Sequence, residues 1–139
     1  MFKAECEAFL GIDDLGLKEV NVVRNRAANP DGFVKENDQI TNAANYVISH
    51  YASFPDQDFA ISAVKFERKL ELGQEGHRYY DLQRWGDVQS ELNRILNYEK
   101  TMDWVSSLYG NTIVRPEDVN FPIPQRQIDL SNGNLVQNS

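Results

Sequence analysis

The stretch from Glu67 to Trp85 constrains the fold of this 139-residue chain more than any other. Glu67, Glu71 and Glu75 recur every four residues, so on an α-helix their carboxylates face the same way. Such a row destabilises a helix by roughly 0.2 to 0.5 kcal/mol per like-charged pair unless cations lie opposite. The acids and bases of the stretch cancel in formal charge, which is typical of an ion-pair network. The pattern therefore predicts a helix whose glutamates find their partners on another segment.

Apolar residues recur at helical spacing through most of the first hundred positions. The sequence predicts helices over residues 2–10, 17–27, 40–51, 56–75 and 77–96. Gly11 and Gly76 are expected to end two of them, because glycine readily adopts the left-handed conformation of a helix terminus. Gly86 is expected to lie inside the last one, at a cost of about 1 kcal/mol against alanine. No convincing strand pattern precedes residue 110, so the predicted fold class is all-α.

Composition excludes several classes of partner. The net charge of −7 and the pI near 4.8 argue against nucleic acid and anionic lipid, which both attract basic surfaces. The length suits a single domain over residues 1–139. No apolar run approaches the roughly 20 residues that span a bilayer, and no signal-peptide pattern opens the chain, so the chain itself is expected to be soluble and unanchored. Cys6 has no second cysteine to pair with, and a buried thiol is the expected state.

The charged stretch could also carry a metal site or a catalytic acid or base. Paired-helix metal sites use Glu-x-x-His, whereas Glu75 and His77 are two residues apart and point different ways on a helix. We therefore expect no metal and no cofactor. An enzyme that uses Glu75, His77 or Asp81 would need these groups to converge in a cleft. We therefore favour a structural ion-pair network over a catalytic role for these residues.

The segment after residue 97 offers the candidate ligand contacts. Tyr98, Trp104 and Tyr109 stand among polar residues, and aromatic rings with polar neighbours are typical of carbohydrate sites. The competing interpretation is core packing, which we favour for Trp104 because Val105 and Leu108 could share its side of a helix.

The charged stretch also carries a resemblance to a known family. The run Glu67-Arg68-x-x-Glu71-Leu72-x-x-Glu75-Gly76-His77-Arg78-x-x-Asp81-Leu82-x-Arg84-Trp85-Gly86 resembles the signature near the C-terminus of the SusD/RagB family. These are surface-exposed nutrient-binding lipoproteins of the Bacteroidetes outer membrane. Asn21-x-Val23-Arg24-x-Arg26-Ala27 and Phe121-Pro122-Ile123-Pro124 resemble two further family segments in the same order. Gly73 departs from the pattern, where a larger apolar residue or alanine is usual.

The resemblance implies a fold and a division of the chain. It implies tetratricopeptide-like helix pairs with an irregular, partly extended C-terminal tail, as the C-terminal part of a larger protein. The expected parts are a helical core over 1–97 with its signature at 67–86, a variable segment over 98–116 and an extended tail over 117–139. At least one of Arg24 and Arg26 is expected to reach the row of glutamates. The signature residues expected to hold the helices in register, with Trp85 filling the core, are Glu67, Arg68, Glu71, Glu75, Arg78, Asp81, Arg84 and Trp85.

The resemblance also implies a function. The whole protein would bind a polysaccharide or oligosaccharide at the outer face of the outer membrane, act with a TonB-dependent transporter, and break no bond. In the family, the glycan site is built largely from regions outside this C-terminal part. The alternative is a purely structural domain that contacts the transporter without binding sugar.

Overall fold

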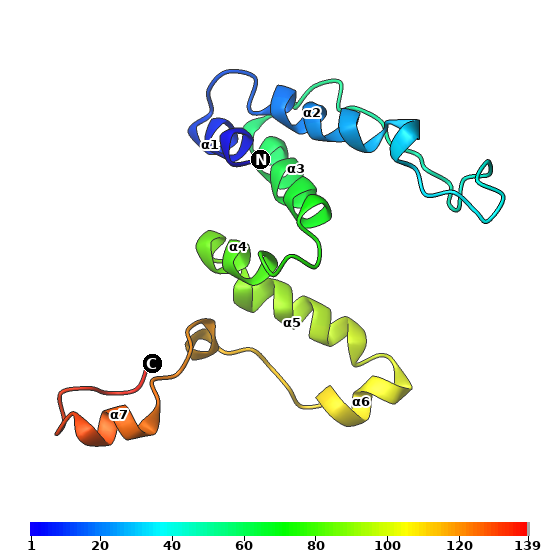
Figure 1. Cartoon of the computed structure of the whole chain (residues 1–139). Coiled ribbons are helices and arrows are strands. Elements are labelled where there is room, and N and C mark those ends of the chain that lie inside the picture. The colour runs from blue at the N-terminus through cyan, green and yellow to red at the C-terminus, as the bar shows by residue number, and fades with distance from the viewer. Residues whose placement is uncertain (139) are drawn as a thin grey trace. The chain divides into compact units, whose positions relative to one another are not determined.

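The computed structural model describes residues 1–138, apart from the side chain of Ser106 (Figure 1). Its helices are α1 (Phe2–Leu10), α2 (Leu17–Ala27), η1 (Pro30–Gly32), α3 (Gln57–Glu71), α4 (Arg78–Trp85), α5 (Val88–Glu99), α6 (Asp103–Tyr109), η2 (Pro116–Val119) and α7 (Gln125–Leu130). Within these described residues there is no strand, and one isolated antiparallel bridge joins Lys35 to Asn42. The all-α prediction is therefore confirmed. The chain forms two compact units, Met1–Gly73 and Gln74–Ser139, and the expectation of one domain stays a prediction.

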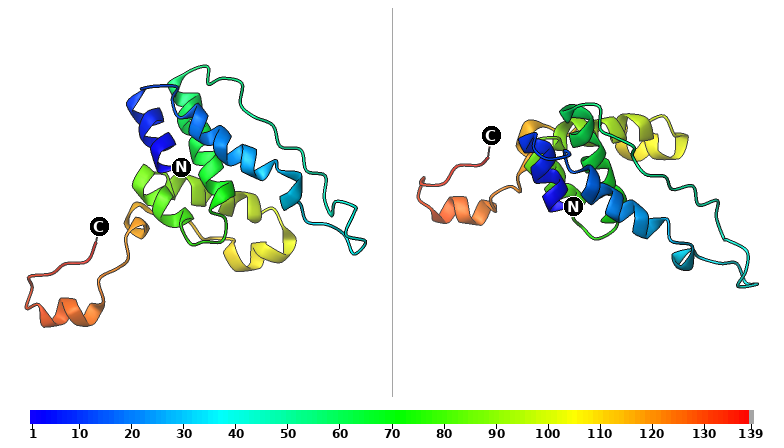
Figure 2. Two further views of the ribbon diagram at one scale, coloured as in Figure 1. Left: turned by 45° about the horizontal axis from the view of Figure 1, so that its top comes forward. Right: turned by 90° about the horizontal axis from the view of Figure 1, so that it is seen from above.

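In the first unit, α1, α2 and α3 pack against one another (Figure 2), and small side chains form the core between them. That core consists of Ala4, Ala8, Val20, Ala60 and Val64. Small side chains let helix backbones approach closely, and Gly16 lies directly against the Ala4 backbone. Its φ is +82°, and a Cβ there would lie 2.5 Å from the carbonyl oxygen of Ala4.

The helix ends of this unit follow local sequence signals. Gly11 ends α1 with a φ of 67°, as predicted. Asp56 begins α3 by accepting a hydrogen bond from the Phe59 amide at 2.7 Å. The Asp14 carboxylate accepts hydrogen bonds from the amides of Gly16 and Lys18, at 3.2 and 2.9 Å, ahead of α2.

The predicted helix over residues 40–51 is wrong. Asp38 accepts hydrogen bonds from the amides of Ile40 and Thr41, both at 2.8 Å, and this closes a tight turn. The side chains of Ile40 and Val47 are 80% and 78% exposed, so the expected apolar stripe meets no core. The segment instead leaves the end of α2, turns, and returns beside α2 to the start of α3 (Figures 1 and 2).

Two further predicted helix boundaries are wrong. Gly86 adopts a φ of 78° and ends α4, so the predicted helix over 77–96 is divided into α4 and α5. The helix α3 ends at Glu71 rather than at Gly76, which leaves Glu75 in an exposed link. Helix α4 does begin at Arg78, close to the predicted start.

The tail combines a short helix with extended pieces. Pro124 precedes α7, a helix that the sequence analysis did not predict. Ile123 precedes α7 and Gln137 follows it, and the two residues are paired. The side chain of Gln137 donates to the Ile123 carbonyl at 3.0 Å and accepts from the Ile123 amide at 2.9 Å. The expected irregular, partly extended tail therefore has α7 between its two paired ends.

Two smaller findings complete the fold. Cys6 is exposed, so the expectation of a buried thiol is wrong: it lies on the outer side of α1, whose inner positions hold Ala4 and Ala8. No helix among residues 1–138 is long and apolar enough to cross a membrane.

Candidate functional site

Two arginines near the end of α2 bind the glutamates of α3. Arg24 forms an ion pair with Glu67, and Arg26 forms one with Glu71. This confirms the prediction that at least one of these arginines reaches the row of acids. Glu67 is only 4% exposed, so its carboxylate depends on this partner, because an unpaired buried charge is strongly destabilising. Glu75 lies outside the helix, and its carboxylate is 3.9 Å from His77 Nε2.

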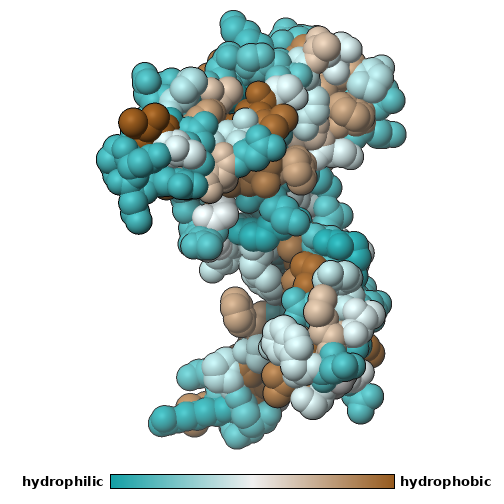
Figure 3. All heavy atoms as spheres, turned by 90° about the vertical axis from the view of Figure 1, so that its right-hand side faces the viewer, coloured by the Kyte–Doolittle hydropathy of each residue, from teal (hydrophilic) through white to brown (hydrophobic). Residues whose placement is uncertain are grey.

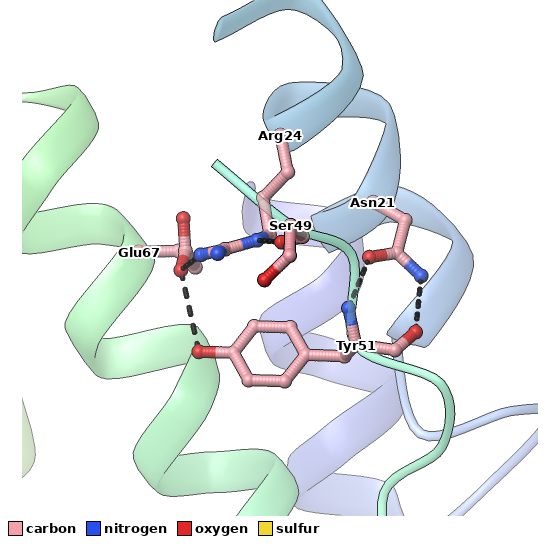
Figure 4. A network of polar contacts seen from close by, with 5 residues as sticks. All are labelled: Asn21, Arg24, Ser49, Tyr51 and Glu67. Carbon is pink, nitrogen blue, oxygen red and sulfur yellow. Dashed lines mark hydrogen bonds and ion pairs between the residues drawn. The ribbon is translucent and has the colours of Figure 1, made fainter. Parts of the chain in front are cut away.

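A wider polar network surrounds the first of these ion pairs (Figure 4). The Arg24 Nε–H donates to the carbonyl of Ser49, and its guanidinium carbon lies 4.8 Å from the centroid of the Tyr51 ring. The Tyr51 hydroxyl donates to Glu67 at 3.4 Å. The Asn21 carboxamide donates to the Tyr51 carbonyl at 2.9 Å and accepts from its amide at 3.0 Å.

The network holds the returning segment against α2 and α3. Burial raises the pKa of the Tyr51 hydroxyl above its usual value, and the neighbouring Glu67 charge acts in the same direction. The sequence analysis missed Ser49 and Tyr51 as partners because it predicted a helix over these residues.

An apolar hollow of about 320 Å³ lies beside these ion pairs. It is lined by Val23, Arg24, Ala27, Val47, Ile48, Phe66, Glu67, Leu70 and Glu71. Both of its carboxylates are paired with arginine. The acids of this hollow therefore hold helices together, and this arrangement does not suit a general acid or base.

A buried pair joins α1 to α3. Arg68 and Glu5 are 2% and 5% exposed, and Arg68 Nε lies 3.7 Å from the Glu5 carboxylate. The Phe2 ring centroid lies 4.5 Å from the guanidinium carbon of Arg68. Glu5 was not singled out from the sequence, since nothing in its neighbourhood marks an acid on the inner side of α1.

The second half of the signature forms its own ion pairs within α4 and α5. Buried Asp81 accepts from Arg84 at 2.9 Å, and Arg78 lies 3.3 Å from Glu91. Arg94 binds both Glu91 oxygens, at 2.8 and 3.0 Å. These bonds lower the pKa of Glu91 to about 2, with the hydrogen bond from Arg94 as the main cause.

Trp85 is half-buried, so the expectation that it fills the core is wrong. Its ring centroid lies 6.0 Å from the guanidinium carbon of Arg78 and 5.4 Å from that of Arg84. Because α4 ends at Gly86, Trp85 occupies the last turn of a short helix, where its ring lies near cationic side chains.

The three aromatic candidates of the variable segment are exposed but separate. Trp104, Tyr98 and Tyr109 are 74%, 64% and 42% exposed. Core packing of Trp104 is therefore wrong: Val105, at 1% exposed, is the residue that α6 buries. No ring contact described within residues 1–138 joins any two of the three.

A second hollow, of about 220 Å³, was not predicted from the sequence. It is lined by Tyr79, Glu117, Asp118, Asn120, Phe121, Pro122, Gln137 and Asn138. Its two rings lie 6.4 Å apart between centroids, and Phe121 is 79% exposed. Tyr79 donates to the Val119 carbonyl at 2.8 Å, and Gln83 donates to the Asn120 side chain at 3.1 Å. These bonds fix the wall of the hollow to α4.

The residues of an acid–base enzyme do not meet in either hollow. Glu75 and His77 are both more than half exposed, and Asp81 is buried against Arg84. Neither hollow is lined by any of the three.

The comparisons with known proteins agree on one family. The sequence model of the SusD family matches residues 1–139. A similar curated protein is the SusD-like protein P25 of Formosa agariphila, 37% identical over 76 residues. These residues cover 55% of this chain and 13% of that protein, so the match spans a small part of the relative. No solved structure matches the chain.

Proposed function

The chain belongs to the SusD family, and from this premise we propose that it is part of a glycan-binding component of nutrient uptake at the outer membrane. The SusD family is a family of binding proteins, not of enzymes. The ion-paired state of Glu67, Glu71 and Asp81 supports a structural role for these acids. We therefore propose that the chain binds and does not catalyse.

The hollow beside Tyr79 is the observation that best supports sugar binding within this chain. Exposed Phe121 and half-buried Tyr79 offer ring faces, and the apolar faces of sugars stack on such rings. The carboxylate and carboxamide groups of Glu117, Asn120 and Gln137 line the same hollow, where they can bind hydroxyls.

The surface of α6 and the end of α5 is a second candidate for the same ligand. Trp104 and Tyr98 are more exposed than Tyr109, and all three stay proposed contacts. Trp104 and Leu108 lie four residues apart, so they share one face of α6.

A structural domain without a sugar site is the alternative function. Apolar side chains stand at the surface among polar ones (Figure 3), and Phe2, Leu10 and Val22 of the first unit are all at least 60% exposed. Such a surface suits contact with another protein. The polar rim of the Tyr79 hollow favours the sugar-binding interpretation.

Affinity gel electrophoresis against a panel of soluble plant, host and microbial polysaccharides tests the proposal. We expect one polysaccharide to retard the chain, and Phe121→Ala to abolish this retardation. Trp104→Ala tests the second surface in the same gels. Phe9→Ala, which truncates an exposed ring of α1, is the matched control. Retardation that survives both Phe121→Ala and Trp104→Ala, or no retardation by any polysaccharide, contradicts a sugar site at these surfaces and favours the structural alternative.

The transporter partnership is a separate part of the proposal. We propose that the full-length protein acts with a TonB-dependent outer-membrane transporter. Purification of the tagged full-length protein from outer membranes is expected to yield that transporter in a stable complex. Recovery of the protein without any TonB-dependent transporter would contradict the partnership.

A further inference from the structure

Three carboxylates converge in the first unit, and none of them lines either of the hollows described above. Glu7 lies on α1, Glu19 lies on α2, and Asp14 lies in the link between these helices. Each offers one oxygen atom, and these three atoms lie within 4.8 Å of one another. The acids are separated in the sequence by seven and five positions, so no ligand motif marks them there.

Lys3 pairs with two of these three acids. Lys3 Nζ lies 3.0 Å from Glu7 Oε1 and also forms an ion pair with Glu19. Hydrogen bonds to Glu19 and Glu7 raise the pKa of Lys3 above its usual range, and the same lysine lowers the pKa of Glu19. The Lys3 side chain is 67% exposed, so it can swing into solvent without disturbing the core. Three carboxylates thus lie together, and the exposed ammonium of Lys3 is paired with two of them.

Glu7 adds an independent observation. The residue is only 4% exposed, and its second oxygen, Oε2, is buried without a hydrogen-bond partner. A buried carboxylate oxygen that lacks a partner costs about 1 to 3 kcal/mol or more, so such atoms normally face a donor or a cation. The lysine satisfies only the other oxygen of Glu7.

Asp14 is fixed by the fold rather than by the lysine. Its Oδ1 and Oδ2 accept hydrogen bonds from the amides of Gly16 and Lys18. A carboxylate oxygen has a second lone pair, so both atoms can still coordinate an ion. The residue therefore presents a preorganised ligand beside the two helices.

We propose that Glu7, Asp14 and Glu19 form a binding site for a hard divalent cation of the calcium type, which displaces Lys3 when it binds. Calcium takes six to eight oxygen ligands in flexible geometry, and carboxylates that bind through one or both oxygens suit it. The cluster contains no histidine or cysteine, so it does not suit zinc. Magnesium demands nearly ideal octahedral geometry, which an irregular set of acids from two helices and a link supplies poorly.

Calorimetric titration of the chelator-treated 139-residue chain with CaCl2 tests this site. We expect one calcium ion per chain and a higher melting temperature in calcium than in chelator. Glu19→Gln is expected to weaken calcium binding by at least tenfold, and Glu36→Gln, a change at an exposed acid outside the cluster, is expected to leave it unchanged. Glu19 is preferred to Glu7 as the test residue because Glu7 is buried.

Lys3→Gln separates a cation site from a simple ion-pair cluster. If calcium and the lysine compete, this variant binds calcium more tightly, by roughly fivefold, because the ion must no longer displace the lysine from its partly exposed ion pairs with Glu7 and Glu19. Its melting temperature falls in chelator and recovers in calcium. A Lys3→Gln variant that loses stability and is not rescued by millimolar calcium overturns the proposal. Equal binding of MgCl2 and CaCl2 overturns the assignment to calcium.

Discussion

At the scale of single residues, three carboxamide side chains form the backbone hydrogen bonds that a neighbouring β-strand would form in a sheet. Asn21 pairs with both backbone groups of Tyr51, Asn93 with those of Val114, and Gln137 with those of Ile123. All six distances lie between 2.8 and 3.0 Å. A carboxamide carries an acceptor oxygen and a donor NH2 group side by side, so it can bind both backbone groups of an extended residue as a neighbouring strand would. The described all-α chain thereby holds extended segments without a sheet.

The Asn21 pair can be tested by a nearly isosteric change. Asn21→Asp keeps the acceptor but replaces the donor with an oxygen that faces the Tyr51 carbonyl. We expect a loss of about 1 to 3 kcal/mol in the free energy of unfolding, measured by urea denaturation. Asn29→Asp is the control, because the Asn29 side chain only accepts, from the Asp31 amide. Equal losses in the two variants would contradict the role of the Asn21 donor.

The lowered pKa of Glu91 predicts how the stability of the chain depends on pH. Its pKa in the folded chain is about 2, below its ordinary value of 4.5, so the folded state binds its proton less readily than the unfolded state. Its contribution is therefore complete above pH 4.5 and is lost as the pH falls toward 2. Because the Glu91 side chain is 18% exposed, solvent screening reduces that contribution to about 1 to 2 kcal/mol.

Urea denaturation of Glu91→Gln across pH 2 to 7 checks this expectation. The variant should be less stable than the original chain at pH 7, and the two should converge near pH 2. Glu117→Gln removes one charge from an exposed residue of the same unit and controls for net charge. A deficit of Glu91→Gln that stays constant over this range would contradict the explanation.

At the scale of elements, the sequence predicted helices well where local signals and burial agree. α1 ends at Gly11 and α3 begins after Asp56, because a left-handed glycine and a capping carboxylate act within a few residues. The segment after Asp38 also begins with a capping carboxylate and is not helical. Its apolar positions find no partner, and packing of an apolar face supplies most of the stability of a helix. The residues around Ile40 in the sequence do not determine whether its side chain is buried, because burial depends on which distant segments pack against it.

In the link between α1 and α2, one added methyl group at Gly16 is expected to destabilise the chain strongly. Gly16→Ala forces a side chain into a left-handed residue, at about 1 to 2 kcal/mol, and also places Cβ against the Ala4 backbone. We expect a total loss of roughly 2 to 5 kcal/mol in the free energy of unfolding. Gly76→Ala is a matched control, since Gly76 has a φ of +76° with nothing within 4 Å of its Cβ position. Similar losses in both variants would show that the close approach to Ala4 is unimportant.

At the scale of the whole molecule, the family could be predicted from the sequence, whereas the hollows could not. The signature residues lie in one run, so they are visible together. The hollow beside Tyr79 is assembled from residues 79, 117, 118, 120–122, 137 and 138, which only the fold brings together. Trp104 was assigned to the core because helical spacing does not distinguish the two faces of α6.

The division into two compact units predicts where a protease acts first. The link over residues 73–77 is exposed throughout, and it contains Glu75. A glutamate-specific protease needs a flexible, accessible backbone, whereas Glu67 is buried within α3. We expect the first cut after Glu75, seen by mass spectrometry as fragments 1–75 and 76–139. Glu75→Gln should slow the appearance of both fragments, and Glu36→Gln should not. A first cut after Glu36 would instead show that the turn closed by Asp38 opens more readily than the link, although the Glu36 amide donates to the Thr41 carbonyl at 2.8 Å.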